Sequence, residues 1–233
     1  MYMNTKVLSF DTEFTGLRKD TTLISLGVVD YNSVDATKAN MFYAEFTDYD
    51  KSQCDEWIKK NVISKLILKD MSKNTKSVGY LNTKKFTKTF VKGDREFVKD
   101  EFIKWINQYY KAYDNIQMVS DVCHYDFVLF IDLFGSAFDL PDKIVPYCKD
   151  ITEDLGRALY GSYRKAFDYD RTKLFDTIIQ VDRKDDIIKE MGLTQHNSLC
   201  DAFQIAYIYD VKEFLAAYVG EDDETSLKNI NLI

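Results

Sequence analysis

Hydrophobic residues near the start of the chain fall into three short runs. Each run is rich in β-branched and aromatic residues, which favour strands. They predict strands at 6–11, 23–31 and 41–46. The polar spacers between them are short, so we expect the three strands to pair as antiparallel neighbours.

The remainder of the chain predicts helices alternating with two further strands. Apolar residues recur at helical spacing in several segments, and β-branched residues cluster in two others. The expected helices are 55–68, 94–110, 127–134, 151–160 and 198–218, and the expected strands are 117–123 and 144–148. Because strands that alternate with helices pair in parallel, we expect an α/β fold with a mixed central sheet flanked by helices.

Two polar segments interrupt this pattern. Residues 69–93 are rich in Lys, Thr and Asn and have little apolar periodicity, which predicts a loop. A second polar excursion covers about 161–193. Neither resembles a linker between domains, and we expect a single domain over 1–233.

Charge is distributed unevenly along the chain, whose net charge is −7. This balance argues against a protein that coats nucleic acid uniformly. Residues 51–104 nevertheless carry 14 Lys and Arg against 7 Asp and Glu, and the remainder carries 17 against 31. The asymmetry indicates either an element that faces a polyanion or, more simply, a solvated lysine-rich surface.

The cysteines and the hydropathy predict a cytoplasmic protein. The four cysteines are scattered without a CxxC pair, which is typical of reduced thiols rather than a disulfide framework or a zinc site. No apolar run is long enough to span a membrane, and MYMNTK lacks a signal-peptide pattern. The Lys-, Asn-, Tyr- and Asp-rich, Pro-poor composition suits a bacterial or phage-infected cell.

The first strand leads directly into two acids in the segment LSFDTEFTGL. Asp11 and Glu13 are two residues apart, so both project from the same face of a strand. Like charges at that distance repel unless a cation lies between them, and Mg²⁺ or Mn²⁺ prefers carboxylate oxygens. The alternative is a solvated turn at the strand end before Thr15 and Gly16.

Further acids occur where strands end and helices begin. Asp126 lies between a predicted strand and helix, where it can also simply interact with free backbone amides. Asp121 ends the same strand and is a rival for that position. His196 is expected on the loop before the last helix and Asp201 on its first turn; alternatively, Ser198-x-x-Asp201 is a capping box.

The order of these residues resembles the DEDDh branch of 3′-to-5′ exonucleases, which implies a ribonuclease H-like fold. DEWIKKNVISKL (55–66), HYDFVLFIDLFG (124–135) and YCKDI (147–151) are similar to RNase AS-type 3′-5′ exoribonucleases and related phage exonucleases. DTEFTGL (11–17) also resembles oligoribonuclease. The resemblance spans most of 6–218 and is weakest at 69–93 and 161–193, where we expect substrate choice to be determined.

The resemblance implies a two-metal hydrolase. Asp11, Glu13, Asp126 and Asp201 would hold two Mg²⁺ or Mn²⁺ ions roughly 3.5–4 Å apart. His196 would take the proton from the attacking water. Asp126 is preferred to Asp121 because Tyr-Asp before FVLF matches the family pattern, while His124 only flanks it. Asp150 is expected to form local hydrogen bonds.

The implied reaction is release of nucleoside 5′-monophosphates from the 3′ end of a single strand, with RNA slightly favoured. Phe14, Leu17 and Tyr125 would contact the terminal base, and the lysines between 73 and 92 would follow the phosphates. A homodimer is implied by family analogy. An exodeoxyribonuclease of the same branch and an inactive nucleic-acid-binding module are the alternatives; a nucleotide-binding protein would want a Gly-rich phosphate loop, which the sequence lacks.

Overall fold

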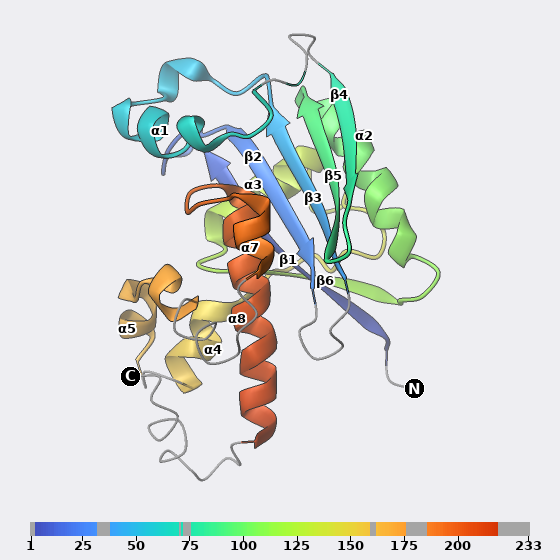
Figure 1. The fold of residues 1–233 in the computed structure, drawn as a ribbon, viewed down its shortest axis with the longest axis vertical. Coiled ribbons are helices and arrows are strands. Elements are labelled where there is room, and N and C mark those ends of the chain that lie inside the picture. Colours follow the sequence, from blue (N-terminus) through green and yellow to red (C-terminus); the bar gives the residue numbers. More distant parts are fainter. Residues whose placement is uncertain are drawn as a thin grey trace.

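The fold is organised around a seven-stranded mixed sheet in the order β4-β5-β3-β2-β1-β6-β7 (Figure 1). The structure, a computed structural model, describes residues 3–31, 38–69, 71, 76–158, 162–175 and 186–218. Within this part of the chain, no helix has the length and apolar character needed to cross a membrane.

The first three strands form the predicted antiparallel meander. They are β1 (Thr5–Phe14), β2 (Leu23–Asp30) and β3 (Ala39–Phe46). β1 is longer than expected, so Asp11 and Glu13 lie inside the strand, opposite Gly27 and Ser25 of β2. The two acids therefore have a fixed backbone register rather than the freedom of a turn.

A β-hairpin occupies 77–93, so the loop predicted over 69–93 was wrong for that part; residues 70 and 72–75 lie outside the described residues. β4 (Ser77–Asn82) pairs with β5 (Phe86–Gly93), which in turn pairs in parallel with β3. Lys88 on β5 is only 5% exposed, and its Nζ lies 4.4 Å from the centre of the Phe90 ring. Because a lysine stands where a strand pattern requires an apolar residue, the alternation of apolar and polar residues that predicts a strand is interrupted here.

The last two strands lie on the other side of β1. β6 (Asn115–Ser120) pairs in parallel with β1, and β7 (Lys149–Asp150) pairs in parallel with β6. The strand predicted at 144–148 is wrong: Ile144 makes an isolated bridge to Ile116, and only two residues form β7. Pro146 within that segment has no amide to donate to a ladder.

Most predicted helices are present, although the helix expected at 55–68 is shorter. The helices that match are α2 (Arg95–Ile106), α3 (His124–Phe134), α4 (Ile151–Ala158) and α8 (Ser198–Tyr218). The first helix, α1 (Glu56–Asn61), ends early, and a 3-10 turn follows at Ile63–Lys65. The polar excursion contains α5 (Tyr163–Asp168) and α7 (Asp186–Met191), while 176–185 lies outside the described residues.

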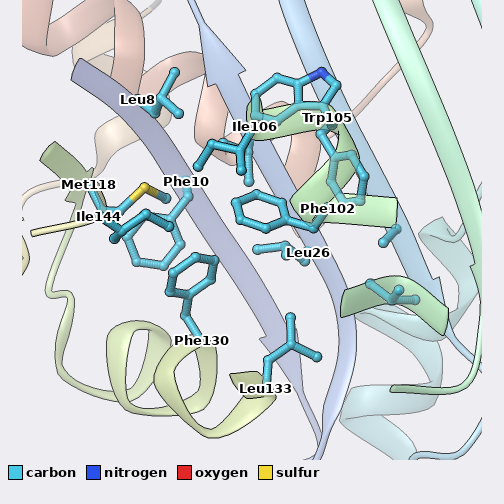
Figure 2. Close-up of a cluster of buried hydrophobic side chains, with 14 of the residues drawn as sticks. Leu8, Phe10, Leu26, Phe102, Trp105, Ile106, Met118, Phe130, Leu133 and Ile144 are labelled. Carbon is cyan, nitrogen blue, oxygen red and sulfur yellow. The ribbon is translucent and has the colours of Figure 1, made fainter. Parts of the chain in front are cut away.

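Helices cover both faces of the sheet, each over its own hydrophobic cluster (Figure 1). On one face, α2 and α3 pack against the even-numbered residues of β1, such as Leu8 and Phe10 (Figure 2). On the other face lies α8, and its hydrophobic cluster also includes buried residues of α4 and α5. Over 199–208, nearly every side chain of α8 is buried, so this part of the helix is apolar around most of its circumference.

Phe130 anchors α3 against β1 and thereby positions the start of that helix. Its ring centroid lies 5.4 Å from that of Phe10 and 5.5 Å from that of Phe102, and its side chain is fully buried. Truncating a phenylalanine in such a core costs about 3–5 kcal/mol. The first turn of α3 is therefore held next to the carboxyl end of β1.

Candidate active site

A cavity of about 590 Å³ lies at the carboxyl end of β1. All five residues predicted to carry the chemistry line it: Asp11, Glu13, Asp126, His196 and Asp201. They come from β1, α3 and the start of α8, which are far apart in the sequence.

A difference in strand length brings Asp126 to this cavity. The ladder between β1 and β6 ends at the Ser9–Val119 pair, whereas β1 continues to Phe14. The Thr12 amide has no partner strand there and donates to Asp126 Oδ1 at 3.0 Å, and Thr12 Oγ1 donates to the same oxygen at 2.6 Å. Asp126 lies on the first turn of α3, as predicted, and its carboxylate is oriented by β1 itself.

A glycine brings the start of α8 against β2. A Cβ added to Gly27 would lie 2.3 Å from the Ser198 carbonyl oxygen, closer than any real side chain is found. Next to it, the Ser25 and Ser198 hydroxyls are 2.9 Å apart. Since Gly27 and Ser25 pair with Asp11 and Glu13, this close approach places the first turn of α8 beside both acids.

His196 lies on the loop before α8 and Asp201 on its first turn, as predicted. His196 has a φ of 62°, and its backbone amide donates to Asp201 Oδ2 at 2.9 Å. The capping-box alternative for Ser198 is wrong, because Asn197 Oδ1 accepts from the Leu199 amide and caps the helix instead. The His196 ring also contacts the Trp57 ring, at 5.3 Å between centroids.

Burial and neighbouring acids raise the pKa of all four carboxylates. Burial, with smaller contributions from neighbouring acids, raises the pKa of Glu13 to about 8 and that of Asp201 to about 7. Burial raises the pKa of Asp126 to about 6 against the two Thr12 hydrogen bonds, and raises the pKa of Asp11 well above its ordinary value. Within the described part of the chain, none of the four has an ion-pair partner.

This set of donors fits a hard divalent cation. Glu13, His196 and Asp201 each offer a ligand atom, and these atoms lie within 4.8 Å of one another. Asp11 and Asp126 add carboxylate oxygens to the same cavity. A divalent ion relieves the repulsion that raises the pKa values, and carboxylate oxygens are the ligands that Mg²⁺ and Mn²⁺ prefer.

His196 is neutral at physiological pH. Burial, with a smaller effect of Lys65, lowers the pKa of its imidazole below the usual 6.5. A neutral imidazole can accept a proton, so the side chain is suited to act as a base. The other histidine, His124, is exposed at the start of α3 and is not among the described residues that line the cavity.

Asp121 also lines the cavity, but it is neutralised by a residue that sequence reasoning missed. Arg171 approaches Asp121 Oδ2 with Nε at 2.7 Å and donates to Oδ1 from Nη2 at 3.0 Å. Arg171 belongs to the polar excursion over 161–193, where no predicted strand ends, so the pattern used to find the acids did not indicate it. Asp150 forms one local hydrogen bond, as expected, accepting from the Thr152 amide at 2.8 Å. It also accepts from the amides of Val122 and Cys123, both at 3.0 Å, which are distant in the sequence and were not predicted.

Of the three residues predicted to contact the base, Phe14 and Leu17 line the cavity, whereas Tyr125 is not among the described lining residues and stacks on Phe14. Phe14 and Tyr125 are stacked, with centroids 5.6 Å apart and planes inclined by 19°. Phe14 and Leu17 line the cavity, and the Leu17 side chain is 77% exposed. Trp57, which was predicted only as part of a helix face, is 54% exposed and lines the same cavity. A tryptophan among the charged and polar residues of EWIKKN is the sequence feature that could have identified it.

The described lysines of the lysine-rich segment (73–92) lie on or beside the edge strands β4 and β5, which β3 and β2 separate from β1, and none is among the described residues that line the cavity. Lys73 lies outside the described residues. Lys76 pairs with Asp94 at 2.9 Å, Lys85 pairs with Glu190 at 3.1 Å, and Lys92 donates to the Leu68 carbonyl at 2.7 Å. These contacts are internal to the protein and lend no support to the prediction that this segment follows a phosphate backbone.

Comparisons with known proteins support the fold. No family model and no curated protein matches the chain in sequence. A solved structure described as "3′-end specific recognition of histone mRNA stem-loop by 3′-exonuclease" is similar to it, with a TM-score of 0.56 and 13% identity over 93% of this chain and 84% of the other. At that identity the likeness shows the fold. The chain therefore has the predicted ribonuclease H-like α/β fold, shared with that exonuclease.

Proposed function

We propose that the protein is a metal-dependent 3′-5′ exonuclease that releases nucleoside 5′-monophosphates from single-stranded nucleic acid, with RNA favoured. The observation that carries this proposal is the convergence in a single cavity of one histidine and four carboxylates that have no ion-pair partner among the described residues. The fold likeness to a 3′-exonuclease supports it.

The carboxylates would hold two Mg²⁺ or Mn²⁺ ions. Bound ions would supply an activated water and stabilise the negative charge on the leaving 3′-oxygen. Asp11, Glu13 and Asp201 must lose their protons to bind them, and Asp126 offers its Oδ2 because Thr12 occupies Oδ1. These four side chains are the ligands that we assign.

His196 would accept the proton of the attacking water. Its backbone is held by Asp201 Oδ2, and its ring lies edge-on to Trp57, so the imidazole is oriented before substrate binds. A positioned base of this kind typically contributes about 10²–10⁴-fold to the rate.

The rim would hold the terminal nucleotide by stacking. Phe14, Tyr125 and Leu17 present apolar surface beside the carboxylates, and stacking on aromatic rings tolerates every base. The proposal therefore predicts weak base preference. Preference for RNA over DNA requires recognition of the 2′-hydroxyl, and the assay below separates the two. The homodimer implied by the family resemblance can be tested by light scattering.

The decisive assay uses 5′-labelled single strands of RNA and DNA with the same sequence, together with a circular RNA that has no 3′ end. With Mg²⁺ or Mn²⁺ we expect a ladder that shortens from the 3′ end, released mononucleotides, no cleavage of the circle and no reaction in the presence of a chelator. Faster hydrolysis of DNA would assign an exodeoxyribonuclease. Binding of the strands without cleavage would instead indicate an inactive module, and cutting of the circle would contradict exonuclease action.

A further inference from the structure

Two cysteines lie close to the candidate active site but take no part in its proposed chemistry. Cys123 ends the turn between β6 and α3, and Cys148 directly precedes β7. The Cys123 thiol is close enough to the Cys148 thiol to raise its pKa, and both side chains are partly exposed. The remaining cysteines, Cys54 and Cys200, are buried, at 7% and 1% exposure. The pair is thus separated from the other thiols by both position and accessibility.

Several contacts hold the Cys148 sulfur beside the start of α3. Its Sγ lies 3.4 Å from the Lys149 carbonyl oxygen, and the next two residues, Lys149 and Asp150, pair with Val119 and Ser120 at the end of β6. Its side chain packs against the hydrophobic cluster beneath α2 and α3. The sulfur therefore faces the side of the sheet on which Cys123 leads into α3.

Asp150 fixes the Cys123 side of the pair. Its carboxylate accepts from the Val122 and Cys123 amides, both at 3.0 Å. Val122 has a φ of 51°, which is unfavourable for a β-branched residue and marks a tightly constrained turn. Because Asp150 is only two residues beyond Cys148 and pairs with Ser120 across the sheet, this clamp draws the two cysteine-bearing segments together.

We propose that Cys123 and Cys148 form a reversible disulfide site, with a low-molecular-weight disulfide such as oxidised glutathione as the oxidant. In the first step, the Cys123 thiolate attacks one sulfur of the reagent, breaks its S–S bond and releases one thiol. In the second step, Cys148 loses its proton, attacks the Cys123 sulfur and releases the other thiol. Two protein thiols are oxidised and one reagent disulfide is reduced to two thiols.

The surroundings favour this order of attack. The neighbouring Cys123 thiol and burial raise the pKa of the Cys148 thiol, so it is poorly suited to make the first attack on a reagent in solution. Once Cys123 carries the mixed disulfide, the adjacent Cys148 needs no diffusion to reach it. The resulting bond would join β7 to the turn that precedes α3, the helix that carries Asp126. Its formation does not depend on the proposed nuclease activity.

The test is performed on the native, fully reduced chain. The protein is incubated with oxidised glutathione, denatured, treated with N-ethylmaleimide and digested without reduction before mass spectrometry. We expect a peptide pair linked through Cys123 and Cys148, maleimide only on Cys54 and Cys200, and reversal of the link by dithiothreitol.

Two variants make the result specific. Cys148→Ser lacks the resolving thiol and should retain glutathione on Cys123, whereas the matched control Cys54→Ser should still form the link. The proposal is overturned if all four thiols of the wild type remain free for maleimide. It is also overturned if wild-type Cys123 or Cys148 retains glutathione without forming the link, or if the link involves Cys54 or Cys200.

Discussion

The two ends of the β1–β2 strand pair differ in whether their charged side chains have partners of opposite charge. At one end, Lys6 Nζ lies 2.5 Å from Asp30 Oδ1, and Tyr109 donates its hydroxyl to Asp30 Oδ2 at 2.8 Å. At the other end, Asp11 and Glu13 face Asp126 and Asp201, and no cationic side chain pairs with them in the described part of the chain.

One end of β1 therefore carries an ion pair that stabilises the fold, and the other end carries the acids of the candidate site. Removing a charge from water is costly unless an opposite charge and hydrogen bonds compensate for it, and the Lys6–Asp30 end meets that requirement. The Asp11–Glu13 end does not, and four acids in one cavity keep raised pKa values. Conflicts of this kind are typical of functional sites. A divalent ion would compensate the negative charge of the acids at the second end, as Lys6 compensates the charge of Asp30 at the first.

The largest expected effect comes from exchanging one acid at each end. Asp11→Asn should lower exonuclease activity by about 10³-fold or more, because ligands that hold catalytic metals contribute several kcal/mol to the transition state. Asp30→Asn should leave activity within about twofold but lower the free energy of unfolding by about 1–3 kcal/mol, because Lys6 loses its partner. Steady-state kinetics and urea unfolding measure both effects. Equal losses of activity in the two variants would erase the distinction between the ends.

His196→Ala should reduce kcat by about 100-fold or more, since the variant lacks the proposed base. The matched substitution His124→Ala, at an exposed position outside the cavity, should retain the wild-type kcat. Single-turnover hydrolysis at saturating Mg²⁺ isolates this step from metal binding. If His196→Ala cleaves at the wild-type rate, the base has been assigned to the wrong residue.

Gly27→Ala should cost about 1–3 kcal/mol of stability, because its Cβ would collide with backbone atoms at the start of α8. The displaced helix would carry Asp201 away from Glu13, so affinity for Mn²⁺ should also fall. Gly79→Ala, whose Cβ would meet nothing closer than 3.5 Å, is the control. Thermal unfolding and Mn²⁺ titration check the two effects, and a Gly27→Ala protein with wild-type values for both would show that the close approach is dispensable.

The smallest effect concerns pH. The pKa values of Glu13 and Asp201 are raised from 4.5 and 3.8 to about 8 and 7, so folding favours their protonated forms. Their contribution to metal-free stability is present below pH 4 and is lost as the pH rises through 7 and 8. Mg²⁺ should therefore raise the Tm by a few degrees more at pH 8 than at pH 6. Calorimetry tests this, and a gain in Tm that does not change with pH would contradict it.

The sequence predicted the positions of the candidate site residues better than it predicted the edges of the sheet. Asp11, Glu13 and Asp201 stand where strand or helix periodicity gives them a definite position, and all three line the cavity. The β4–β5 hairpin was missed because Lys88 occupies a core position. The strand expected at 144–148 contains Pro146, and only β7 forms beyond it.

Contacts between distant segments could not be predicted from local pattern. Arg171 reaches Asp121 from a polar segment, and Trp57 reaches His196 from a short helix. The hydrogen bonds from Thr12 to Asp126 depend on β6 ending before β1 does. Each of these contacts depends on tertiary structure, which periodicity does not encode.

The most direct test of the proposed metal site is the binding of Mn²⁺ to the wild type, Asp11→Asn and Asp30→Asn, measured by calorimetric titration at neutral pH. If the carboxyl end of β1 holds two metal ions, the wild type and Asp30→Asn should each bind two Mn²⁺ ions per chain, and Asp11→Asn should bind them much more weakly. A wild-type protein that binds no Mn²⁺, or an Asp11→Asn variant that binds it as the wild type does, would contradict a metal site at this end of β1.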